Sequence, residues 1–152
     1  MMWLWIGLGA AGLVLAVWFM WRVGNLAREA RALFETQRPA LERQYFEAAA
    51  RSGKPRGLRW KACEWARGAE FARERATGQL AALVPVTIQF EAVEGSDMEG
   101  LPAVGNLRNA SAVFFFRSGK WHTTGKTVFN LNPDEALEHF KNHYQRLDGT
   151  SS

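Results

Sequence analysis

The chain has 152 residues, enough for one domain and an appended segment. It is 47% hydrophobic and 22% charged with a formal net charge of +4, which excludes a disordered or collagen-like chain. The single cysteine excludes an internal disulfide framework and a zinc site built from several cysteines.

Residues 1–21 contain no charged side chain and read MMWLWIGLGAAGLVLAVWFMW. The hydrocarbon core of a bilayer is about 30 Å thick and needs roughly 20 apolar residues in a helix. Tryptophan favours both membrane–water interfaces, and two tryptophans stand near each end of this segment. The sequence therefore predicts a single transmembrane helix in contact with lipid. The side chains expected at the membrane interfaces are Trp3, Trp5, Trp18, Trp21 and Arg22.

A cleaved signal peptide is the alternative interpretation of this segment. Such a peptide has a basic region before its apolar core and small residues at the cleavage site. Nothing basic precedes the apolar residues here, and bulky side chains occupy residues 18–21. We therefore expect a retained signal anchor. Small residues at Gly7, Ala11, Gly12 and Ala16 would allow a second membrane helix to approach closely.

The charges that follow the apolar segment predict its orientation. Arg22, Arg28, Arg31 and Arg38 all follow it, and basic residues near a span tend to stay in the cytoplasm. We expect the N-terminus outside and residues 22–152 in the cytoplasm. One cysteine is compatible with that reducing compartment.

Residues 22–53 are expected to form a helical juxtamembrane stalk, because apolar side chains recur there at spacings of three and four. Pro39 removes a helix hydrogen bond and suits the first turn of a new helix, so the sequence predicts a break or kink near it. Two interpretations of the apolar stripe stay open. It packs onto the protein's own domain, or it forms a short coiled coil with a partner or a second copy.

Residues 54–148 are predicted to form an α+β domain, a small antiparallel β-meander with a packed C-terminal helix, before a disordered tail at 149–152. The expected strands are residues 58–65, 71–76, 80–92, 112–116 and a return over 120–131. Pro85 predicts an edge position or a bulge in its strand. Phe114 and Phe116 share one face and Phe115 the other, which predicts a central strand covered on both faces.

The last helix has the strongest local signals. Asn132 suits its N-cap, Pro133 its first turn, and the two acidic residues that follow its positive end. The pattern predicts that this helix continues to Leu147. It would then place His139 and His143 along one side, where a metal could bind. The residue after His139 is Phe140 rather than the glutamate that a zincin motif needs, and we interpret both histidines as surface residues.

Charge is segregated in the predicted domain. Glu94, Asp97 and Glu99 make the long connection 93–110 acidic, while a basic stretch precedes the domain. The expected partner surface comprises Glu94, Asp97, Glu99, Arg51, Lys54 and Arg56. Nucleic acid is not expected as a partner, because residues 54–152 hold thirteen basic and eleven acidic residues, a weaker excess than nucleic-acid binding needs.

No motif predicts a catalytic, cofactor-binding or metal-binding residue, and no cofactor is expected. Cys63 is interpreted as a buried or edge thiol rather than a nucleophile. The leading hypothesis is a single-pass membrane-anchored module that binds a protein partner or forms a homo-oligomer. One alternative is a tethered ligand-binding or enzymatic domain, and another is a structural subunit of a membrane assembly. In the first alternative, the residues expected to line the pocket are Trp60, Trp65, Phe115, Trp121 and His122.

Overall fold

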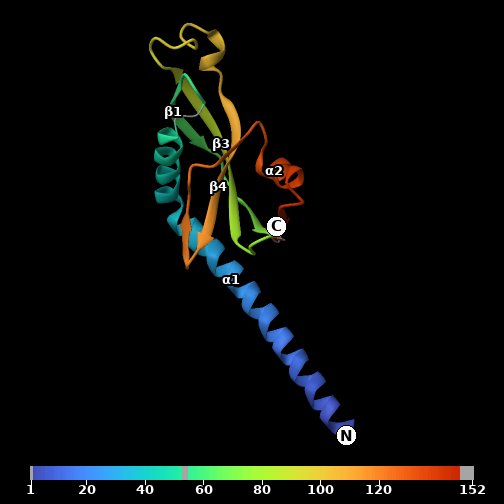
Figure 1. Ribbon diagram of the computed structural model, residues 1–152. Helices are drawn as coiled ribbons and strands as arrows, with labels where there is room; N and C mark the ends of the chain where they lie inside the picture. Colours follow the sequence, from blue (N-terminus) through green and yellow to red (C-terminus); the bar gives the residue numbers. More distant parts are fainter. Residues whose placement is uncertain (1, 53–54, 148–152) are drawn as a thin grey trace. The chain divides into compact units, whose positions relative to one another are not determined.

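The computed structural model describes the backbone of residues 2–52 and 55–147, and the side chains of those residues from Gly12 onward. It is an α+β structure with a long N-terminal helix, an antiparallel sheet and a short C-terminal helix (Figure 1). The elements in chain order are α1 (Met2–Arg51), β1 (Leu58–Trp65), β2 (Glu70–Glu74), β3 (Leu80–Ala92), the 3-10 helix η1 (Pro102–Gly105), β4 (Arg108–Arg117), β5 (Lys120–His122), β6 (Thr127–Phe129), α2 (Pro133–His139) and β7 (Tyr144–Arg146). The α+β class and the antiparallel sheet predicted from the sequence are confirmed.

The chain forms two compact units, residues 1–36 and residues 37–152. In the first unit, large apolar side chains are exposed from Leu13 to Trp21, and both of these residues are about two-thirds exposed (68% and 66%). The guanidinium of Arg22 lies 5.2 Å from the centre of the Trp18 ring, one helical turn away.

Among the residues whose side chains are described, no helix is both long enough and apolar enough to cross a membrane. The transmembrane helix over residues 1–21 therefore stays a prediction. Its first part, which includes Trp3 and Trp5, lies outside the described side chains.

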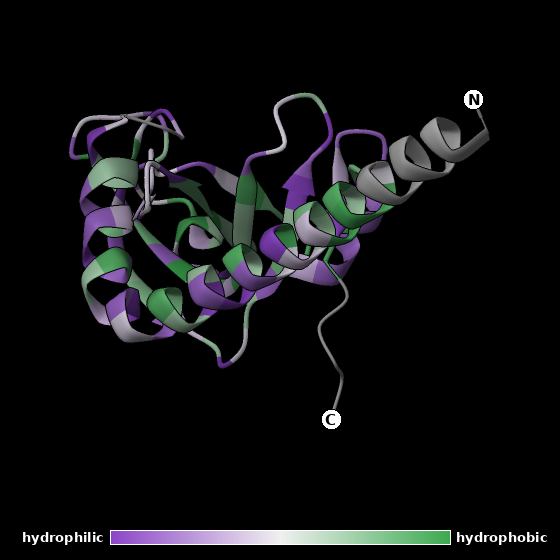
Figure 2. Ribbon diagram, turned by 90° about the horizontal axis from the view of Figure 1, so that it is seen from below, coloured by the Kyte–Doolittle hydropathy of each residue, from purple (hydrophilic) through white to green (hydrophobic). Residues whose placement is uncertain are grey.

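Helix α1 continues through Pro39, so the predicted break between two helices is not observed. Hydrophobic and hydrophilic bands alternate along it (Figure 2). Residues 37–51 belong to the second unit and bury Leu41, Tyr45 and Ala49 against the sheet, as the first interpretation of the apolar stripe expected. This burial stabilises the turns after Pro39, although proline lacks the N–H that a helix needs at that position.

Arg38 connects the second unit's part of α1 to the sheet. Its guanidinium donates hydrogen bonds to the carbonyl oxygens of Ala66 and Gly68, at 2.5 and 3.2 Å, and its Nε bonds Glu42 at 2.8 Å. The sequence treated Arg38 only as a positive charge following a membrane span. In the folded protein it holds the connection between β1 and β2 against α1.

The sheet is only in part the predicted meander. Strands β2, β3, β4 and β5 are neighbours in that order, as a meander requires. However, β1 pairs with β3 rather than β2, and β7 adds to the outer edge of β2. Strands β1 and β2 pair with consecutive parts of β3 on the same side of that strand. The segment at Arg67 and Gly68 therefore connects two strands that do not pair with each other, and it is not a hairpin turn.

Pro85 lies in the middle of β3, which is paired on both sides, and not in an edge strand. Its carbonyl accepts a hydrogen bond from the Ala66 N–H at 3.1 Å, on the side where β2 ends and β1 begins. The ring nitrogen faces the same side, since the N and C=O of one strand residue point the same way. Proline is tolerated because no ladder hydrogen bond is required in that gap.

One face of the sheet is covered by α1 and one end of the other face by α2. Residues 80–84 of β3 are buried on both faces, whereas from residue 85 onward only alternate side chains are buried. The predicted face of β3 is confirmed by the burial of Ala82, Val84, Val86, Ile88 and Phe90. Strand β4 is central, with β3 on one side and β5 and β6 on the other.

The C-terminal helix starts where predicted but ends much earlier. The Asn132 side chain accepts a hydrogen bond from the Glu135 N–H, and the Glu135 carboxylate accepts one from the Asn132 N–H, which completes a capping box. Helix α2 ends at His139, and Tyr144–Arg146 forms strand β7 instead of a helical turn. The prediction of a helix to Leu147 was wrong because the free edge of β2 offers backbone hydrogen bonds that a longer helix would leave unmade.

Candidate functional site

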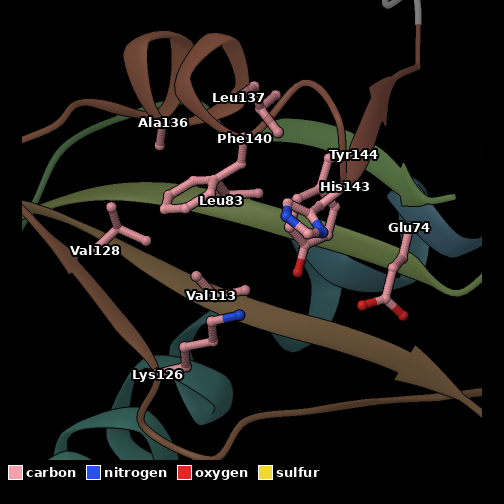
Figure 3. Close-up of a pocket in the computed structure, with 10 residues that line it drawn as sticks. All are labelled: Glu74, Leu83, Val113, Lys126, Val128, Ala136, Leu137, Phe140, His143 and Tyr144. Carbon is pink, nitrogen blue, oxygen red and sulfur yellow. The ribbon is translucent and has the colours of Figure 1, made fainter. Parts of the chain in front are cut away.

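A cavity of about 290 Å³ lies between α2, β7 and the sheet (Figure 3). Its walls are mainly apolar side chains from both helix and sheet. The residues that line it are Glu74, Leu83, Val113, Lys126, Val128, Ala136, Leu137, Phe140, His143 and Tyr144. Ligand sites in proteins are usually apolar hollows of this kind with a few polar groups around them, so this cavity is the candidate site.

Small side chains lie where α2 meets the sheet, and one of them, Ala136, lines the cavity. Ala72, Ala81 and Ala136 are fully buried in the cluster that joins α2 to the sheet. Alanine fills too little volume to close the space between a helix and a sheet, whose side chains otherwise interdigitate. Leu83, Val113 and Leu137 complete the cluster, and Phe115, Val128, Leu131 and Tyr144 pack around it.

Two sequence features fix the position of α2 over this cavity. The capping box at Asn132 sets where the helix begins. The hydroxyl of Ser111, a fully buried polar side chain on β4, donates a hydrogen bond to the Leu131 carbonyl at 2.8 Å. At the other end, Arg146 of β7 forms ion pairs with Glu70 and Asp134, which joins β7, β2 and α2.

Four polar side chains line the cavity, from different parts of the chain, and Tyr144 of β7 contributes its hydroxyl. Lys126 precedes β6, and its Nζ lies 5.8 Å from the centre of the Phe115 ring and 6.0 Å from that of Tyr144. Glu74 ends β2, and its carboxylate accepts a hydrogen bond from the Thr77 hydroxyl. His143 follows α2 (Figure 3). The cavity thus combines an apolar interior with an amine, a carboxylate, an imidazole and a phenol hydroxyl.

The aromatic pocket considered from the sequence is not formed. Trp60 and Trp65 pack around Tyr45 on the α1 face, and buried Trp121 packs against Phe71 and Phe116. The remaining two, Phe115 and His122, are cross-strand partners and line a shallow hollow on the opposite face. Strand pairing separates these five residues because the direction of each side chain follows from its register.

The two histidines do not form the predicted helical pair. His139 is the last residue of α2 and packs edge-on against Phe140, while His143 lies beyond the helix end at the cavity. Within the described part of the chain, no three His, Cys, Asp or Glu side chains are grouped to hold a metal ion. The sequence missed the contribution of His143 to the cavity because it assumed a longer helix.

Two groups between α1 and the sheet hold their protons strongly, the half-buried Cys63 thiol and the buried Tyr45 hydroxyl. Burial raises the pKa of the Cys63 thiol to about 12, which makes it a poor nucleophile at neutral pH. Burial also raises the pKa of the Tyr45 hydroxyl, although its hydrogen bond to Thr127 lowers it. The Thr127 hydroxyl donates to the Gly125 carbonyl at 2.9 Å, so Tyr45 donates to Thr127 across 2.5 Å.

The predicted partner surface has its acidic and basic halves at one end of the sheet. The carbonyl of Gly57 accepts hydrogen bonds from the Val93 N–H at 2.9 Å and the Ser96 hydroxyl at 3.2 Å. This joins the start of β1, beside Arg56, to the loop after β3. Arg51 and Arg56 are exposed, and Lys54 lies outside the described residues.

The connection between β3 and β4, residues 93–107, is shorter than predicted because β4 begins at Arg108. It folds on itself: the Gly95 N–H bonds the Glu99 carboxylate at 2.8 Å, and η1 forms its second half. Glu94, Asp97 and Glu99 are all exposed, and none of them forms an ion pair within the described part of the chain.

Comparison with protein-family models, with curated proteins and with solved structures finds no match to this chain.

Proposed function

We propose that this protein is a membrane-anchored interaction module. Residues 1–21 hold it in a bilayer as a single-pass helix, and the loop 93–107 binds a protein partner that carries a basic and apolar segment. The observation that carries this proposal is the combination of three exposed carboxylates with exposed Val93, Leu101 and Leu107 on that loop. Exposed apolar side chains surrounded by polar ones are typical of protein-binding surfaces.

The loop is suited to recognition because its shape is fixed before a partner arrives. Hydrogen bonds within the loop and to Gly57 hold its backbone, so little conformational entropy is lost on binding. Its carboxylates would attract a basic partner, while exposed Arg51 and Arg56 nearby would repel a wrongly oriented one.

The anchor is supported by the sequence of residues 1–21 and by the exposed side chains of its second half. Eight large apolar residues between Leu13 and Trp21 are more than half exposed in the first unit. A helix that is apolar all round is stable in lipid or inside a larger assembly, and not in water. The position of Arg22 over the Trp18 ring suits a membrane interface.

Membrane anchoring and membrane orientation are tested by two separate experiments. The double variant Gly12→Arg, Leu13→Arg, near the middle of residues 1–21, should move the protein from the carbonate-resistant membrane fraction to the supernatant, because a charge at the bilayer centre costs about 2.5–3.5 kcal/mol per residue. A phosphatase that folds only outside the cytoplasm, fused after Ser152, should be inactive. Activity of that fusion would reverse the proposed orientation.

The partner surface is tested by charge reversal on the full chain. A tagged protein is captured from membranes in mild detergent, and stoichiometry is read by native mass spectrometry. The triple variant Glu94→Lys, Asp97→Lys, Glu99→Lys should lose the stoichiometric partner. The matched control Glu47→Lys, Glu64→Lys, Glu138→Lys changes three exposed carboxylates elsewhere and should retain it. Equal capture by both variants would exclude the loop, and a second copy as the captured partner would make the protein a homo-oligomer.

A second candidate function is ligand binding by the same domain. The cavity under α2 favours this function. No residue of loop 93–107 lines the cavity, so the proposed partner surface gives no explanation for it.

A further inference from the structure

We propose that the cavity under α2 binds a small amphipathic carboxylate. Its apolar part, an aromatic ring or a branched chain, lies between α2 and the sheet, and its carboxylate lies beside the Lys126 amine. This site is independent of the partner surface, so either proposal can fail without the other.

The size of the cavity limits the ligand. A volume of about 290 Å³ corresponds to roughly ten water-sized groups at about 30 Å³ each. Most of the lining side chains are apolar, Leu83, Val113 and Leu137 among them. A ring with a short acidic side chain fits those two conditions, whereas a long acyl chain exceeds the volume.

The contacts of Lys126 and Glu74 indicate which charge the ligand should carry. The Lys126 amine lies over the Phe115 and Tyr144 rings, and within the described residues no carboxylate pairs with it. The Glu74 carboxylate accepts the Thr77 hydroxyl and is thereby engaged with the turn between β2 and β3. Lys126 is exposed at the edge of the cavity, whereas Glu74 is half-buried. The amine is therefore the accessible charge of the two, and a ligand anion at the edge of the cavity would pair with it.

His143 gives the site a second donor. Its backbone is fixed on both sides, since its N–H bonds the Phe140 carbonyl at 2.8 Å and its carbonyl accepts the Arg75 N–H at 2.8 Å. The imidazole lines the cavity between α2 and β7 (Figure 3). An imidazole carries at least one N–H in either protonation state, so it can donate to a carboxylate.

The test is a methyl NMR titration of the full chain in lipid nanodiscs, which avoids competition from detergent. The probes are 3-phenylpropionate, 3-phenylpropan-1-ol and 3-phenylpropylamine, which share the ring and chain and differ in charge. We expect saturable shifts of the methyl signals of Leu83, Val113 and Val128 with the acid. The alcohol should bind about tenfold more weakly, since a hydrogen bond to a charged group is stronger than a neutral one. The amine should be weaker still.

Variants assign the charge. Lys126→Met should weaken binding of the acid about tenfold and leave the alcohol unchanged. Lys61→Met removes an exposed lysine from β1 and is the matched control, with no change expected. Glu74→Gln should tighten binding of the acid by removing a like charge. Ala136→Leu should abolish binding of all three probes by filling the cavity, and an unchanged Val84 methyl signal on the other face would show that its fold is intact.

Three results would overturn the proposal. One is the absence of saturable shifts with the acid. The second is equal affinity for acid and alcohol. The third is an equal effect of Lys126→Met and Lys61→Met on the acid.

Discussion

On the face of the sheet covered by α1, the Tyr45 ring touches the rings of Trp60, Trp65 and Phe114, with centroids 5.3–6.1 Å apart. On the face covered by α2, the buried residues include three alanines, and a cavity of about 290 Å³ remains. Strands β3 and β4 contribute side chains to both faces. The difference shows that large rings fill the core on the α1 side of the domain, while the α2 side, which is richer in small residues, keeps a cavity.

The first prediction concerns the filled face and has the largest expected effect. Tyr45→Ala should lower the free energy of unfolding by about 3–5 kcal/mol, because removing a buried aromatic ring leaves a cavity that its neighbours cannot fill. Chemical denaturation of the full chain followed by tryptophan fluorescence measures it. Leu137→Ala on the α2 face should cost less, near the lower end of about 2–5 kcal/mol, since it enlarges an existing hollow. An equal cost would remove the contrast between the faces.

The second prediction concerns Gly125, where the chain passes close to the backbone of α1. Gly125 has a φ of +75°, and a Cβ added there would lie 2.5 Å from the Ala49 nitrogen. Gly125→Ala should cost about 2–4 kcal/mol, since it combines a left-handed alanine with a clash against backbone.

Gly119 provides the control for that substitution. It has the same φ of +75°, and a Cβ there would meet no atom within 4 Å. Gly119→Ala should therefore cost only about 1–2 kcal/mol, the conformational part alone. Similar melting temperatures for the two variants would show that contact with α1 is not what requires Gly125.

The third prediction compares one alanine from each face. Ala82 is fully buried on the α1 face and is paired with Phe114, whereas Ala136 lines the cavity. Ala82→Val should destabilise the protein by about 1–3 kcal/mol through overpacking. Ala136→Val should change stability by less than about 1 kcal/mol, because the extra methyl groups enter empty space. Matched urea titrations decide between them, and an equal loss in both would mean that the α2 side is as tightly packed as the α1 side.

The prediction with the smallest effect at neutral pH concerns the pH dependence of stability. The pKa of the Cys63 thiol is raised to about 12 in the folded protein, so the unfolded chain loses this proton first as the pH rises. Stability should therefore be constant below about pH 8.5, the ordinary pKa of cysteine, and should fall toward pH 12. Cys63→Ala should flatten this decline in denaturation curves at pH 8, 10 and 11. An unchanged slope would assign the decline to Tyr45, whose pKa is raised in the same direction.

The positions of several strands could be read from local pattern. Alternating apolar residues placed β1 and β3 at the bounds that the structure has. The gap between the strands predicted over residues 112–116 and 120–131 contains the turn between β4 and β5, where Ser118 and Gly119 have positive φ. The signal for α2 was equally local, because Asn132 and Glu135 cap the helix with their own side chains. Such features need only neighbouring residues, which is why the sequence reveals them.

The candidate site could not be read in this way. Its lining comes from β2, β3, β4, β6, α2 and β7, and nothing in the order of these residues brings them together. The alanines at 72, 81 and 136 looked like ordinary core residues. Their effect on volume appears only when α2 is placed over the sheet.

By itself, then, the sequence determined the α+β class, the strands with clear alternation, the start of α2 and the charged segments, because these depend on contacts between near neighbours. Only the tertiary structure decided the rest. A bulge between Trp60 and Ala62 brings Trp60 and Trp65 to one face, where strict alternation would separate them. The free edge of β2 makes Tyr144–Arg146 a strand, and Gly125 is required by the backbone of α1. In each case a distant partner supplies the energy that outweighs the local preference.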